Sequence, residues 1–140
     1  GRTWSAKATR KHLAARLQRQ HRQLVKAAAQ WVSLSADERH ALRKRAKRLR
    51  YLAEFAWPLM TEHAGTTRAA SRYLRRLARL QEALGAYNDA LVAQSQKSSG
   101  GKPSAADWFS RGYWSAQADA LAQACEKPLQ RLAKAQVFWH

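Results

Sequence analysis

Hydrophobic residues recur along this chain at the three- and four-residue spacing of α-helices. In the first segment with this spacing, the apolar stripe consists of Leu13, Leu17, Leu24, Ala28 and Trp31. Such positions share one side of a helix that advances about 100° per residue. No segment alternates polar and apolar residues as a half-buried β-strand would. The pattern therefore predicts an all-α protein.

Four segments of this kind predict helices over residues 5–31, 35–63, 67–96 and 105–134. Helices of about 27 residues are ~40 Å long, and four of them with short connections pack most simply as an antiparallel bundle. A chain of 140 residues can bury one hydrophobic core but not two. We therefore expect a single domain, residues 1–140, folded as an antiparallel four-helix bundle.

Start and stop signals lie near the ends of these segments. Ser35-Ala-Asp-Glu38 has the pattern of a capping box, and Ser104-Ala-Ala-Asp107 should cap the fourth helix in the same way. A kink is expected around Pro58, because proline removes a backbone donor and crowds the preceding turn. Gly65 provides a left-handed stop before the third helix.

The fourth helix opens with large aromatic residues, namely Trp108, Phe109, Tyr113 and Trp114. They are not interleaved with cations as nucleic-acid stacking platforms are. We therefore expect them to close one end of the core rather than to rest against a partner. Cys125 is the only cysteine, which excludes an intramolecular disulfide, and we expect it to be a small buried side chain.

The charge of the chain is extreme and uneven. The formal net charge is +17, and residues 1–80 hold 20 lysines and arginines against 4 acidic residues, whereas residues 81–140 hold 6 against 5. Such an excess destabilises a compact state by self-repulsion unless anions relieve it. We therefore expect a polyanionic partner for the first half of the chain.

The densest cationic segment runs from His40 to Tyr51 in the second predicted helix, with six lysines and arginines in twelve residues. Helical phase places four of its residues within about 80° of one another, opposite the leucines. These four are His40, Arg43, Lys47 and Arg50. Arg45 lies about 140° from His40, so we expect it to snorkel along its stem or to face a surface that another element covers.

Two further helices carry basic faces. The outward side of the third helix holds Arg72, Arg75, Arg76 and Arg79. The first helix holds His12, Arg16 and Arg19, which are placed by helical phase alone, and His12 is open between a structural and a ligand-binding role. A solvated surface explains any one of these faces, but three in one small chain favour a binding surface.

Two motifs resemble the signature of the CHAD domain, a helical domain named for its histidines. They are His40-x-x-Arg43-x-x-x-Lys47-Arg48-Leu-Arg50-Tyr51-x-x-Glu54-Phe55 and Leu77-x-x-Leu80-Gln81-x-x-Leu84-Gly85-x-x-Asn88-Asp89. The closing Leu-Ala-Lys134-Ala-Gln-Val-Phe138-Trp139 is also similar to the usual end of such proteins, which often follow an inorganic triphosphatase-like CYTH domain. The resemblance spans essentially the whole chain, but only the second of the two helical halves of a complete domain.

This resemblance implies a polyphosphate-binding module in which basic side chains of the two halves line a central groove. It implies that His40, Arg43, Lys47 and Arg50 contact phosphates. The arginines of the third helix are carried over less firmly, because the family varies there. Another chain segment, or a second copy related by two-fold symmetry, would have to supply the missing half.

Other polar residues of the motifs are expected to have supporting roles. Tyr51 and Glu54 fall toward the basic face by phase, and Glu54 should hold arginine side chains in place. Asp89 should anchor an arginine. Gln81 and Asn88 should be architectural, because buried amides need partners, with Gly85 between them allowing a close helix approach.

Inorganic polyphosphate has no bases, so its affinity should come from many charge-assisted contacts. Arginine can donate two parallel hydrogen bonds to phosphate oxygens, and lysine acts as a movable point charge. Histidine donates when neutral and adds charge when neighbouring phosphates raise its pKa. A mixture of the three suits a tolerant groove for a phosphate polymer.

Other functions have weaker support. The nine acidic residues are scattered and there is no HExxH, CxxC or Gly-rich phosphate loop, so we expect no catalysis, cofactor or metal. A nucleic-acid-binding module is the main alternative, because any cationic array binds DNA or RNA, but the chain lacks a recognition-helix or RRM signature. An accessory role beside a triphosphatase and assembly through a partner surface are further alternatives.

The location is the last expectation from the sequence. No apolar run reaches the ~18 residues of a membrane span, and the first residues lack the apolar core of a signal peptide. We therefore expect no membrane partner and a cytoplasmic location, with association with polyphosphate granules as one open purpose. Nucleic acid would act as a non-specific competitor.

Overall fold

The computed structural model describes residues 5–61, 64–97 and 104–139, which form helices and no β-strands. The α-helices are α1 (Ala6–Ala28), α2 (Ala36–Ala56), α3 (Thr66–Lys97), α4 (Ala105–Ala124) and α5 (Glu126–Ala133). Two 3-10 turns, η1 (Trp31–Ser33) and η2 (Trp57–Met60), follow α1 and α2. The prediction of an all-α protein is confirmed.

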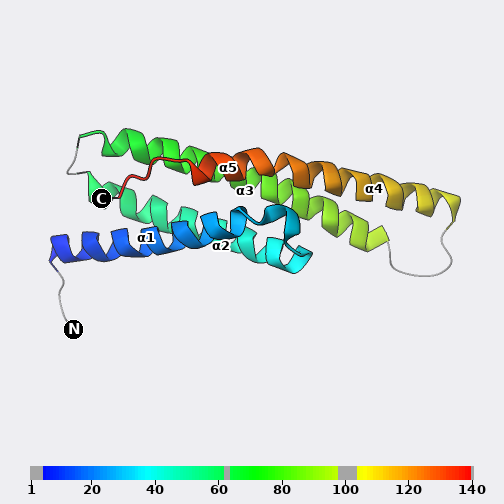
Figure 1. Cartoon of the computed structure of the whole chain (residues 1–140), viewed down its shortest axis with the longest axis horizontal. Coiled ribbons are helices and arrows are strands. Elements are labelled where there is room, and N and C mark those ends of the chain that lie inside the picture. The colour runs from blue at the N-terminus through cyan, green and yellow to red at the C-terminus, as the bar shows by residue number, and fades with distance from the viewer. Residues whose placement is uncertain (1–4, 62–63, 98–103, 140) are drawn as a thin grey trace.

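Helices α1 to α4 run in alternating directions along the long axis of the molecule (Figure 1). α2 packs between α1 and α3, and α3 packs against α4 and α5. α5 continues the direction of α4 and also contacts α1, which closes the bundle. The α3–α4 pair extends beyond the ends of α1 and α2 (Figure 1). The structure is thus an antiparallel four-helix bundle with a projecting helical hairpin.

The predicted caps are present. The Ser35 hydroxyl accepts from the Glu38 backbone N–H at 3.1 Å, and the Ser35 backbone N–H donates to the Glu38 carboxylate at 2.9 Å. Ser104 and Asp107 form the same pair of bonds at the start of α4, at 3.2 Å and 2.9 Å. Gly65 has a φ of 85° immediately before α3, where a residue with a β-carbon would be strained.

The ends of α1 and α2 differ from the predicted ones. α1 ends at Ala28, and Trp31 belongs to η1. α2 ends at Ala56 instead of near residue 63, because Pro58 has no N–H for the helical ladder and the chain tightens into η2. His63 and the predicted linker at 98–103 lie outside the described residues.

The fourth predicted helix is divided at Cys125 into α4 and α5. Pro128 accounts for this break, because its ring crowds the carbonyl of Ala124 and it donates no hydrogen bond to that carbonyl. The Cys125 backbone N–H is shared between the carbonyls of Leu121 and Ala122, both at 3.2 Å, so the last turn of α4 combines α-helical and 3-10 hydrogen bonds. Cys125 is buried, as predicted, and burial raises the pKa of its thiol to about 11.

The core contains the predicted leucine stripes, with Tyr73 at its aromatic centre. Tyr73 is fully buried, and its ring meets the edges of Phe138 and Trp139 at centroid distances of 5.8 and 5.0 Å. The indole N–H of Trp139 donates to Gln18 of α1 at 2.8 Å. The residues that follow α5 therefore fasten α1 to α3.

The aromatic residues at the start of α4 do not close the core, so that prediction was wrong for three of them. Trp108, Phe109 and Tyr113 are 62%, 78% and 54% exposed. They belong to the first turns of α4, and α4 extends together with α3 beyond the ends of α1 and α2 (Figure 1). Trp114 is half-buried and meets the Tyr113 ring edge-on at 5.2 Å.

Candidate functional site

The cationic segment of α2 presents a row of side chains to solvent. We call His40, Arg43 and Lys47 the α2 row. His40 and Lys47 are exposed and Arg43 is half-buried, whereas Leu42, Ala46 and Leu49 on the other side of α2 are buried. Among the described residues, none of the three row members has a hydrogen-bonded or acidic partner. Their donors are therefore available to a ligand.

A small groove of about 10 Å³ lies at the His40 end of this row, between α2 and α3. His40 and Arg43 line it from α2, and Asn88 lines it from α3, above the rings and methyl groups of the core. Asn88 has no hydrogen-bond partner within the described part of the chain, so its amide can donate into the groove. From the sequence, Asn88 was expected to have an architectural role and was not predicted as a site residue, although it belongs to the second CHAD motif.

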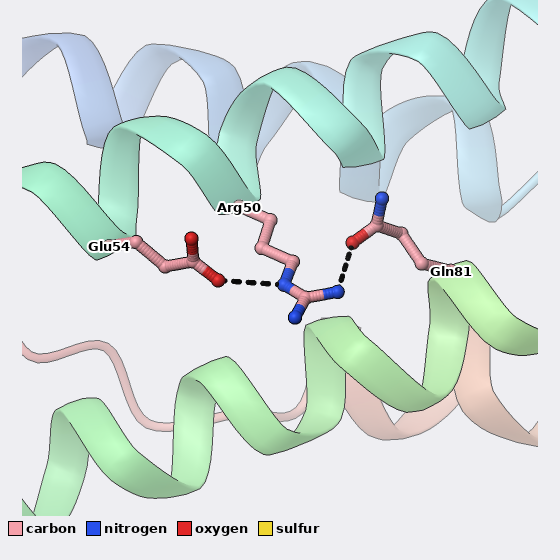
Figure 2. A network of polar contacts seen from close by, with 3 residues as sticks. All are labelled: Arg50, Glu54 and Gln81. Carbon is pink, nitrogen blue, oxygen red and sulfur yellow. Dashed lines mark hydrogen bonds and ion pairs between the residues drawn. The ribbon is translucent and has the colours of Figure 1, made fainter.

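Arg50 also belongs to the basic side of α2, but its side chain is engaged within the protein. Its Nε donates to Glu54 at 2.8 Å and its Nη1 donates to Gln81 of α3 at 2.9 Å (Figure 2). Glu54 therefore holds an arginine in place, as expected, and Gln81 has the partner that a half-buried amide needs. Arg50 therefore joins α2 to α3 and lies at the border of the basic surface.

Tyr51 supports the row from the outside of α2. Its ring is 58% exposed, and the Lys47 ammonium lies 5.9 Å from the ring centroid. A cation at this distance is attracted by the face of the ring. The contact favours a position of Lys47 along the helix surface while leaving its charge in water.

The α1 residues lie along the other side of α2. Arg45 donates from Nη1 to Gln23 of α1 at 2.8 Å, so it extends along the α1–α2 boundary. Arg16 and Arg19 precede Gln23 by seven and four residues and therefore share its side of α1. Both are exposed, as is His12. The α1 face therefore adjoins the flank of α2 that carries Arg45, whereas the α2 row lies on the flank toward α3.

The α3 arginines are turned away from the α2 row. Arg72 precedes Gln81 by nine residues, which is half a turn out of phase, and it lines a depression with Gln136 and Phe138 of the C-terminal segment. Arg76 donates to the Arg131 carbonyl of α5 at 2.8 Å. Arg75 and Arg79 are exposed. None of the pockets lined by the described residues therefore brings the basic faces of α1, α2 and α3 together in one groove.

Two expectations about α3 do not match the structure. Asp89 is exposed and has no partner within residues 5–61, 64–97 and 104–139, so it anchors no arginine there. Gly85 permits no close helix approach, because a β-carbon at this position would meet no atom within 4 Å. Both residues lie on the solvent side of the α2–α3 boundary, where no helix covers them.

His21 is a buried histidine that the sequence patterns did not single out. Its Nδ1 lies 2.7 Å from the Tyr73 hydroxyl, and its ring faces the edge of Trp139. Burial lowers the pKa of His21 and raises that of Tyr73, so both groups are neutral near pH 7. Their bond links α1 to α3 inside the core and is separate from the basic surface.

The described residues contain no group of three or more histidine, cysteine or acidic side chains that could hold a metal ion. Among the same residues, no helix combines the length and the apolar character needed to span a membrane.

Comparison with known families places the two motifs in context. The family model of the CHAD domain matches residues 2–97, which include α1, α2, α3 and the α2 row. The match stops before α4, so the similarity of the C-terminal residues lies outside it. No curated protein and no solved structure matches the chain. Because the match covers more than half of the chain and both motifs, the protein belongs to the CHAD domain family.

Proposed function

We propose that the α2 row binds inorganic polyphosphate without catalysing a reaction on it, and that the exposed cations of α1 extend this basic surface on the other flank of α2. The observation that carries this proposal is the row of His40, Arg43 and Lys47, whose donors have no partner among the described residues. The chain belongs to the CHAD family. The resemblance of its motifs to that family implies a polyphosphate-binding module, so the family supports the same ligand. Arg50 and Asn88 border the row and complete the surface.

The chemistry of the row suits a phosphate polymer better than a nucleic acid. Arg43 can form paired hydrogen bonds with phosphate oxygens, and Lys47 can follow a flexible chain. The rings of Tyr51 and Phe55 are exposed nearby, but no recognition-helix motif accompanies them. Contacts to phosphate groups alone carry no base-sequence information, so they can hold any polyanion. Selectivity among polyanions should therefore depend on the density of charge along the ligand.

A binding role also fits the acidic residues. Glu54 is engaged with Arg50, and Glu38 is engaged in the cap of α2, where the serine bonds lower its pKa. Neither carboxylate is paired with a second one as an acid–base couple would require. We propose that the domain carries a polyphosphate chain for another activity, such as an attached phosphatase domain, or attaches its protein to polyphosphate granules in the cytoplasm.

A titration of four ligands tests the proposal. Long-chain polyphosphate, tripolyphosphate, single-stranded DNA and duplex DNA are compared at equal phosphate concentration, at low and near-physiological salt. We expect long-chain polyphosphate to retain binding at the higher salt, where DNA binding is lost. DNA binding that equals or exceeds polyphosphate binding at both salts would instead favour a nucleic-acid-binding module.

The variant Arg43→Ala/Lys47→Ala tests the site itself. It should weaken the binding of long-chain polyphosphate. The slope of the logarithm of affinity against the logarithm of salt concentration should fall by about one unit per removed cation. Helix content by circular dichroism should be unchanged, because neither side chain has a hydrogen-bonded or acidic partner within the described residues. Lys127→Ala/Lys134→Ala removes the same charge from exposed positions in α5 and at its C-terminal end, and is the matched control. Equal binding by the two variants would show that only net charge matters.

A further inference from the structure

The solvent side of α4 is almost free of charge, whereas an ordinary exposed helix face is charged or polar. Three large rings and three small residues share one sector of the helix there, within about 140° at about 100° per residue. Every residue of α4 in this sector is exposed, and Asp119 is the only charged one among them. We call the six residues the α4 face, and they are Trp108, Phe109, Gly112, Tyr113, Ala116 and Ala120.

Two of the rings are held in place within the protein. The Tyr113 ring meets the half-buried Trp114 edge-on, at a centroid distance of 5.2 Å. The Arg111 guanidinium lies 5.4 Å from the centroid of the Trp108 ring. Such contacts reduce the side-chain entropy that is lost on binding. The α4 face is therefore preorganised for a partner.

The shape of the α4 face suits a copy of itself. Its rings lie in the N-terminal half of α4, and its small residues extend from the middle of the helix into the C-terminal half. A β-carbon added at Gly112 would meet no atom within 4 Å, so the space outside it is open. In an antiparallel pair with a two-fold axis between Gly112 and Ala116, the rings of each copy lie against the small residues of the other. Bulky side chains that enter the gaps left by small ones allow close helix packing.

The distribution of charge also favours a second copy at this face. Residues 1–80 hold 20 lysines and arginines against 4 acidic residues, whereas residues 81–140, which include α4, hold 6 against 5. Two copies that approach through their basic helices repel each other. α4 extends with α3 beyond the ends of α1 and α2 (Figure 1). An approach through α4 therefore brings together the least charged surfaces of the two copies.

The rings supply much of the area that a specific interface needs. A large aromatic residue has about 150–250 Å² to bury, so three rings that are more than half exposed present about 400 Å² in each copy. Two copies then bury about 800 Å² through the rings alone, and specific interfaces begin near about 1,000 Å² in total. The small residues between the rings add to this area. The pair thus lies at the lower end of the size range, which fits a weak and reversible dimer.

We infer that the α4 face is a self-association surface, through which two copies of this chain form an antiparallel pair with two-fold symmetry. The inference is independent of phosphate binding at the α2 row. Salt separates the two, because screening reduces the repulsion between two copies of charge +17. Self-association should therefore strengthen as salt rises, whereas the binding of a phosphate polymer weakens.

Sedimentation equilibrium of the chain without added phosphates, at near-physiological salt, tests the inference. The mass should rise from 15.9 kDa toward twice that value as the protein concentration is raised through the micromolar range. Ala116→Glu should remain a monomer over this range, because it places a charge in the middle of the apolar contact. Ala15→Glu makes the same substitution at an exposed position of α1 and should dimerise like the wild-type protein. Helix content should be the same in all three, because both alanines are exposed and glutamate is a good helix former.

Three results would overturn the inference. A monomer at every concentration would leave the α4 face to a partner of another kind. Dimers of Ala116→Glu as tight as those of the wild-type protein would mean that another surface holds the copies together. Growth beyond a dimer, or an association that weakens as salt rises, would contradict a closed apolar pair. Because the measurement uses no phosphate, its failure would leave the proposal for the α2 row standing.

Discussion

At the scale of the residue, the cations of this protein fall into two kinds. Arg43, Lys47 and Arg72 have no hydrogen-bonded or acidic partner in the described part of the chain. Arg39, in contrast, donates to the Trp31 carbonyl at 3.0 and 3.2 Å and to the Tyr87 hydroxyl at 3.0 Å, with its guanidinium 4.3 Å above the Trp31 ring. Helical phase alone does not distinguish the two kinds, because Arg39, Arg43 and Arg50 all lie on the α3 side of α2. The difference depends on which acceptors the neighbouring helix provides.

Glu54→Gln should strengthen polyphosphate binding. Glutamine can still accept from Arg50, but the negative charge beside the basic surface disappears, and one unit charge at contact distance in water corresponds to about 1 kcal/mol, or about fivefold in affinity. The partly exposed pair contributes about 0.3–0.5 kcal/mol to folding, so the free energy of unfolding should fall by that amount. Binding and denaturant titrations measure the two effects.

Asp119→Asn provides the control for Glu54→Gln. It makes the same change of charge at an exposed position of α4, away from the α2 row. An equal gain in affinity from both substitutions would show that Glu54 has no local effect on the site.

The stability of the protein should decrease as the pH falls below about 6.5, the ordinary pKa of histidine. Burial lowers the pKa of His21, so below this pH the unfolded chain binds a proton that the folded core does not. Stability therefore rises with pH up to that value and is lost as the pH falls toward the lowered pKa of folded His21. Denaturant unfolding between about pH 7.5 and pH 5 should show this loss.

His21→Gln should reduce this dependence on pH, because the substituted residue does not titrate. It should also lower the free energy of unfolding at neutral pH by about 1–3 kcal/mol, since the hydroxyl of Tyr73 loses its partner. A pH dependence as steep as that of the wild-type protein would contradict the role assigned to His21.

At the scale of the element, periodicity was sufficient to predict the helices but not all of their ends. α3 lies within a residue or two of the predicted range, because its leucine stripe is uninterrupted. The prediction at Pro58 was a kink, and the chain instead forms a 3-10 turn. The interruption at Cys125 is predictable from Pro128, three residues further along the chain. In both cases a proline removes a donor from the helical ladder.

The two capping boxes should differ in their contribution to stability. Ser35→Ala should lower the free energy of unfolding by about 1 kcal/mol, because α2 lies between α1 and α3 and unfolds with them. Ser104 starts a part of α4 in which residues 105–109 are all exposed. Ser104→Ala should therefore cause local fraying, visible as faster hydrogen exchange in the first turns of α4, with little change in global unfolding. Equal global losses from both substitutions would contradict this distinction.

At the scale of the whole molecule, the sequence predicted that three helices are basic but not how their faces are arranged. The order of packing decides this arrangement, and it depends on long-range contacts such as those of Trp139 with Gln18 and of Arg76 with α5. These contacts involve residues beyond 97, where the family match ends. The basic face of α1 adjoins the Arg45 flank of α2, the α2 row lies toward α3, and Arg72 of α3 faces the C-terminal segment.

The projecting α3–α4 hairpin is the least basic large part of the molecule. Residues 81–140 carry nearly balanced charge, and the exposed rings of Trp108, Phe109 and Tyr113 lie there. Polyphosphate should therefore leave this hairpin uncovered, which makes it an internal reference for ligand binding.

Mapping of the ligand by amide NMR tests the central claim most directly. Increasing amounts of polyphosphate are added to the labelled protein, and the shift of each backbone amide is recorded. The account predicts that the largest shifts occur at residues 40–51 of α2, while the amides of α4 remain unchanged. Shifts concentrated on α4, or spread evenly over every exposed lysine and arginine, would contradict it.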